Sequence, residues 1–83
     1  MTKYAVATFD FFYGEVIEKI AKQLTYEEAK ELAEKHAMNW TEDEGLKYWT
    51  TEADTGEILC VCSPLSDYGA IVVPMRKKIN ITP

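Results

Sequence analysis

Two cysteines separated by a single residue are the first candidates for chemistry in this chain of 83 residues. On a strand, Cys60 and Cys62 would point to the same face, where two thiolates can share a soft metal ion. A zinc site takes about four ligands, and the single histidine, His36, lies far away in the sequence. We therefore interpret the cysteines as small apolar core residues, and we expect no metal, no cofactor and no disulfide.

His36 is the one candidate for acid–base catalysis near neutral pH. An enzyme would combine it with a carboxylate in a cleft at a dimer interface, but sequence spacing identifies no orienting acid and no nucleophile for it. The alternative is a partly buried histidine near a helix C-terminus, where the helix dipole favours its charged form. We therefore rank an enzyme below a binding protein, and we name no catalytic residue.

Three consecutive acids, Glu42-Asp43-Glu44, carry enough charge for a divalent cation. They lack the alternating oxygen ligands and the late bidentate glutamate of a calcium loop. We interpret them as a solvated connection and predict no metal site there.

The net charge of the chain is −5 and is unevenly distributed. Residues 27–57 contain ten acids against three bases, whereas a basic run, Arg76-Lys77-Lys78, follows near the end. An acidic surface disfavours nucleic acids and anionic membranes, which attract lysine and arginine. A nucleic-acid-binding module that uses Arg76 to Lys78 with sheet aromatics is therefore the alternative. We expect instead a protein partner, preferably basic, at the acids Glu31, Glu34, Glu42, Asp43 and Glu44.

Phe11, Phe12 and Tyr13 form an aromatic run behind an apolar segment. Successive side chains of a strand point to opposite faces, so Phe11 and Phe12 cannot both lie beneath one helix. A single helix covers one face of a small sheet, and large exposed apolar patches mark interaction surfaces. We expect the three aromatic residues to contact a partner and the uncovered face to form a homodimer. The alternative is that the rings complete a small core and its rim.

One helix must position these groups, and its start is well marked. Thr25 precedes Glu28 by three residues, which is the pattern of a capping box, and apolar residues follow at helical spacing. The helix is predicted to end near Met38-Asn39, because asparagine tolerates the left-handed conformation that closes helices. Leu24 would pack onto Ala29 as a hydrophobic staple.

Two strands are predicted before the helix. Residues 3–12 alternate with apolar side chains on both sides, which is typical of a central strand. Residues 15–22 fit helical spacing, but adjacent β-branched residues, the Tyr13-Gly14 turn and the cap at Thr25 favour a strand. We therefore predict a hairpin of these two segments.

Three further strands are predicted after the helix. Residues 46–52 and 57–62 flank a turn at residues 53–56, whose aspartate and glycine suit a short hairpin. Residues 70–73 form a short apolar run that Pro74 is expected to stop.

Residues 1–83 are thus predicted to form a single small α+β domain, with a mainly antiparallel sheet of four to five strands, one amphipathic helix on one face, and the order β-β-α-β-β-β. No apolar run approaches the roughly 20 residues that a membrane span requires. The absence of a secretory signal and the two cysteines lead us to expect a cytoplasmic protein. We expect a small acidic binding or regulatory protein of a bacterium or its virus, which acts through protein–protein contacts.

Overall fold

The computed structural model describes residues 2–38, 45–54, 56–64 and 66–75 of the chain. The described residues form five strands and one helix, and their order, β-β-α-β-β-β, confirms the predicted fold class. The elements are β1 (Lys3–Asp10), β2 (Glu15–Leu24), α1 (Tyr26–Ala37), β3 (Lys47–Ala53), β4 (Gly56–Cys62) and β5 (Tyr68–Met75).

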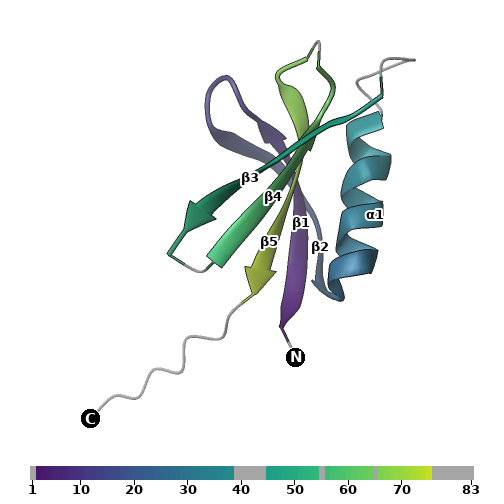
Figure 1. The fold of residues 1–83 in the computed structure, drawn as a ribbon, viewed down its shortest axis with the longest axis vertical. Helices are drawn as coiled ribbons and strands as arrows, with labels where there is room; N and C mark the ends of the chain where they lie inside the picture. Colours follow the sequence, from purple (N-terminus) through teal and green to yellow (C-terminus); the bar gives the residue numbers. More distant parts are fainter. Residues whose placement is uncertain (1, 39–44, 55, 65, 76–83) are drawn as a thin grey trace.

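The five strands form one antiparallel sheet in the order β2-β1-β5-β4-β3, with α1 packed against one face (Figure 1). β1 is an internal strand, as its apolar residues on both sides predict. It pairs with β5 in an unbroken register from Lys3 opposite Met75 to Asp10 opposite Tyr68. β2 and β3 are the two edges of the sheet.

The predicted strand at residues 15–22 is confirmed, and β2 continues to Leu24. Its register with β1 shifts three times, and Gln23 near its end has a φ of 63°. Each shift gives β2 an additional residue relative to β1, which bends the strand and increases its twist. These extra residues explain why its apolar spacing departs from strict alternation.

α1 begins with the predicted capping box. The Glu28 amide donates to Thr25 Oγ1 at 3.2 Å, and the Thr25 amide donates to Glu28 Oε1 at 3.0 Å. The bonds from the Thr25 backbone and side chain lower the pKa of Glu28, because they favour its charged form. The helix ends at Ala37, with Met38 as a right-handed C-cap. Asn39, the predicted left-handed cap, lies outside the described residues.

The contact between α1 and the sheet uses small side chains. Ala29, Ala33 and Ala37 recur every four residues, form one stripe and are completely buried. They pack in one cluster with the β-branched residues of the sheet, among them Val6 and Val61. Leu24 and Leu32 are partly buried against this cluster, so the predicted role of Leu24 as a staple agrees with its position.

Two predicted boundaries were wrong. β1 ends at Asp10, so Phe11 and Phe12 belong to a turn and not to the strand that was predicted through residue 12. Pro74 does not stop β5, because it pairs with Tyr4 of β1. β4 pairs with β5 only as far as Val72, so the proline nitrogen, which has no hydrogen to donate, can face the side without a ladder.

Candidate interaction surface

The sheet face opposite α1, called the open face below, has its own apolar cluster. Odd-numbered residues of β1 and β5 and even-numbered residues of β4 point to it, because cross-strand partners share a face. Ala7, Cys60 and Ile71 are its buried centre. The side chains of Phe9, Phe11, Trp49, Ile58 and Val73 surround this centre and are partly buried.

Three rings form an aromatic row on the open face. The Phe9 and Phe11 centroids lie 5.0 Å apart, and the Phe11 and Trp49 centroids lie 4.8 Å apart. The row joins β1 to β3, although two strands separate them in the sheet. Lys47 Nζ lies 5.6 Å from the centroid of Trp49, which is the geometry of a cation–π contact. The rings bury one another, so the open face is only partly solvent-exposed.

Gly69 occupies the β5 position between Phe9 on β1 and Cys62 on β4. A Cβ at Gly69 would lie 2.1 Å from the Val61 carbonyl oxygen and 2.7 Å from Cys62 Cβ. Only a residue without a side chain allows β4 this close to β5. Gly69 therefore leaves β5 without a side chain at the level of the aromatic row.

The turn between β1 and β2 presents two exposed rings. Phe12 and Tyr13 are 71% and 72% exposed, and their centroids lie 4.9 Å apart in an edge-to-face arrangement. Asp10 Oδ1 accepts hydrogen bonds from the Phe12 amide at 2.9 Å and the Tyr13 amide at 3.2 Å. The Gly14 amide donates to the Asp10 carbonyl at 2.8 Å, and Gly14 has a φ of 71°. The turn is thus held in one conformation by its own backbone and the Asp10 carboxylate.

The three predicted aromatic residues are close together but differ in solvent exposure. Phe11 lies in the aromatic row, and its amide donates to the Asp67 carbonyl at 2.8 Å. Phe12 and Tyr13 contact each other at the adjacent turn and are open to solvent. Tyr68, which is paired with Asp10 and 43% exposed, adds a further aromatic side chain at this end of the sheet.

The predicted acidic residues belong to a different region. Glu31 is exposed on α1, on the other side of the sheet from the aromatic row. Glu34 accepts a hydrogen bond of 2.5 Å from the Tyr48 hydroxyl, and Lys30 Nζ lies 5.7 Å from the Tyr48 ring centroid. The hydrogen bond to Glu34, aided by partial burial, raises the pKa of Tyr48 to about 12. Glu34 therefore links α1 to β3. Glu42, Asp43 and Glu44 lie outside the described residues.

The thiols of Cys60 and Cys62 are free and buried. Burial, followed by the proximity of Cys62, raises the pKa of Cys60 to about 11. Burial also raises the pKa of Cys62. The raised pKa values favour the neutral thiol form near neutral pH, and neutral thiols are poor nucleophiles. Within the described residues, no group of three or more His, Cys, Asp or Glu side chains could hold a metal ion.

His36 is half-buried on α1, between the buried Ala33 and Ala37. In the described part of the chain, no carboxylate or hydroxyl is hydrogen-bonded to its ring. The basic run at Arg76 to Lys78 lies outside the described residues. The described helix is too short and too polar to cross a membrane.

A hollow on the open face was not predicted from the sequence. It has a volume of about 530 Å³ and lies between β2 and β5, above the small side chains of Ala5 and Ala7 on β1. Ile71 and Val73 line it from β5, and Val16 lines it from β2. The signal in the sequence is the alternation of two alanines with larger residues on a central strand, which leaves space above the sheet.

Comparison with known protein families, curated proteins and solved structures gives no match for this chain.

Proposed function

We propose that this chain is a protein-binding module that presents the aromatic end of its sheet to a partner. The observation that carries the proposal is the exposed pair of Phe12 and Tyr13 on a turn fixed by Asp10. Aromatic residues are enriched among the side chains that dominate binding energy at protein interfaces. A fixed turn reduces the conformational entropy that binding would otherwise cost.

The neighbouring surface supports the same proposal. The aromatic row continues from the turn across the open face, and the row and the turn together form an apolar area with a cation at its far side, Lys47. Such an area next to polar residues is typical of a protein interface. Regulation of the partner would then follow from occupation of its surface, without chemistry in this chain.

Photo-crosslinking in the source cells tests the proposal. A benzoylphenylalanine in place of Tyr13 should capture a discrete partner protein, whereas the same residue in place of Glu31 on α1 serves as the matched control. Capture at the Tyr13 position alone, abolished by Phe12→Ala, would support the aromatic end as the interface. Equal capture at both positions, or none at either, would contradict it.

The partner is proposed to be basic, because exposed acids such as Glu27 and Glu31 lie on the outer side of α1. The fold separates these acids from the aromatic row, so charge would act on the approach of the partner more than on the final contact. Charge reversal at Glu27 and Glu31 should slow association and flatten its salt dependence. Unchanged association rates would leave the acids a role in solubility alone.

A homodimer through the open face remains a prediction. The rings of the aromatic row already bury part of each other within one chain. A second copy would therefore bury only the ring surface that remains exposed. Light scattering at high micromolar concentration tests it: a dimer mass would support the prediction, and a monomer mass would remove it.

A further inference from the structure

The hollow on the open face has walls of defined chemistry. Ala5 and Ala7 form its floor, Val73 stands on one side and Val16 on the other. Its volume of about 530 Å³ is within the range of about 300 to 1,000 Å³ that is usual for small-molecule sites. Apolar lining of this kind binds apolar groups by removing them from water.

The irregular register of β2 shapes the hollow. The lining includes the segment from Lys19 to Lys22 of β2, in the part of the strand where the register against β1 shifts. At one end, the Gln23 amide donates to Met75 Sδ at 3.4 Å, so the Met75 side chain reaches past β1 to β2. At the other end, Phe9 pairs with Val16. The hollow is therefore bounded along the strands at both ends.

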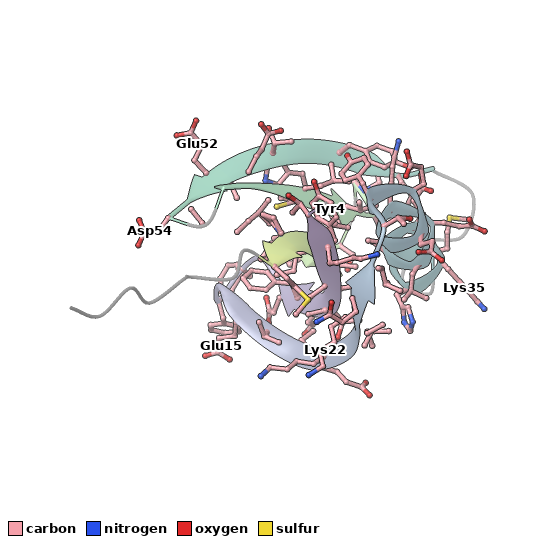
Figure 2. The ribbon with its side chains drawn as sticks, turned by 90° about the horizontal axis from the view of Figure 1, so that it is seen from below. Tyr4, Glu15, Lys22, Lys35, Glu52 and Asp54 are labelled. Atoms are coloured by element: carbon pink, nitrogen blue, oxygen red, sulfur yellow. The ribbon has the colours of Figure 1, made fainter. Side chains whose placement is uncertain are left out.

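The charge at the hollow is opposite to the charge of the chain. Among the described residues that line it, the charged ones are Lys19 and Lys22, and no acidic residue is among them. Within the described part of the chain, neither lysine forms an ion pair with a carboxylate. Figure 2 shows Lys22 on β2, at the opposite edge of the sheet from Glu52 and Asp54 of the β3–β4 hairpin. In a chain of net charge −5, this is a local cationic rim beside an apolar surface.

We infer that the hollow binds an amphipathic small molecule with an apolar chain and one carboxylate. The apolar chain would lie over Ala5 and Ala7, and the carboxylate would accept hydrogen bonds from the ammonium groups of Lys19 and Lys22. The long, flexible lysine side chains suit a ligand whose head group stays near solvent while its chain is buried. This site is separate from the proposed protein interface at Phe12 and Tyr13.

Calorimetric titration with sodium decanoate, below the concentration at which it forms micelles, tests the inference. We expect one decanoate to bind per chain, and decyltrimethylammonium, which carries the opposite charge on a similar chain, to bind at least about tenfold more weakly. The double variant Lys19→Gln/Lys22→Gln should weaken decanoate binding by about tenfold while decan-1-ol binds as before. Lys35→Gln, on the exposed side of α1, is the matched control and should change nothing.

A second variant tests the location. Ala5→Leu places a larger side chain on the floor of the hollow and should abolish decanoate binding, whereas Phe12→Ala should leave it unchanged. Circular dichroism of each variant verifies the fold, and the lysine variants keep the test decisive if Ala5→Leu does not fold. Equal binding of decanoate and decyltrimethylammonium, or no decanoate binding, would overturn the inference. A dimer mass without decanoate binding would assign the hollow to a second copy and would also overturn it.

Discussion

The two faces of the sheet are both apolar, but small side chains are buried on one face, whereas large aromatic side chains are partly buried on the other. Under α1 the helix contributes alanines, and Ala29, Ala33 and Ala37 are completely buried against Val6 and Val61 of the sheet. On the open face, the rings of Phe9, Phe11 and Trp49 contact each other sideways and remain partly exposed. Small residues let a second layer approach closely, whereas large ones compensate for its absence. Where no neighbouring strand lies in close contact, the open face should therefore tolerate added atoms better than the covered face.

The largest effect is expected where the open face is tightest. Gly69→Ala places a Cβ 2.1 Å from the Val61 carbonyl oxygen, so β4 or β5 must move. We expect a loss of about 3 kcal/mol in the free energy of unfolding, measured in urea. A loss below about 1 kcal/mol would show that β4 and β5 adjust freely at this level, and the open face would then be tolerant even at its tightest point.

The same substitution on the two faces is the sharpest comparison. Ala33→Leu adds three carbons to a fully buried contact and should cost about 1 to 3 kcal/mol. Ala5→Leu adds the same atoms above the hollow, where space exists, and should cost about 0.5 kcal/mol or less. Urea midpoints of the two variants test this difference, and equal losses would contradict it.

The start of α1 gives a smaller effect. Thr25→Ala removes the acceptor for the Glu28 amide and should cost about 1 kcal/mol, whereas Thr25→Asp retains an acceptor and should cost much less. Unfolding in urea distinguishes the two variants from the parent. If the alanine variant is as stable as the parent, the covered face does not depend on this cap.

The smallest effect concerns the link between α1 and β3. Tyr48 is 44% exposed, so Tyr48→Phe should change stability near neutral pH by about 0.5 kcal/mol or less. The pKa of Tyr48 is raised from 10.0 to about 12, so the hydrogen bond to Glu34 contributes below about pH 10 and is lost as the pH rises toward 12. The free energy of unfolding, measured by urea melts across this pH interval, should fall more steeply with pH for the parent than for the variant. Parallel curves would remove the hydrogen bond as a cause.

Local signals allowed most of the fold to be predicted. The capping box at Thr25 and the Asp54 hairpin depend on residues close in the sequence, and both are where the pattern places them. The position of β2 was predicted from adjacent β-branched residues, the preceding turn and the helix cap at Thr25, although its apolar spacing is irregular. The predicted strand ends at Phe12 and before Pro74 were wrong because both ends depend on the pairing of β1 with β5, which local sequence does not contain.

The candidate site was less predictable. The exposure of Phe12 and Tyr13 agrees with the aromatic run, but the fixation of their turn by Asp10 could not be anticipated from residue types. Glu34 was expected to contact a partner, and its hydrogen bond with Tyr48 of β3 was not anticipated from the sequence. The hollow requires the lateral order of β2, β1 and β5 together with register shifts. These are long-range properties of the sheet.

The two edges of the sheet also differ, and this has a consequence for assembly. β2 carries three register shifts, and such irregular strands cannot serve as straight templates for another chain. β3 pairs with β4 in one register from Lys47 to Ala53, without a shift or a proline. Its outer backbone groups are thus arranged as a regular strand edge. Under conditions that favour aggregation, strands of other molecules would therefore add at β3. A charged residue in place of Thr50 should suppress fibril growth more than a charged residue introduced on β2.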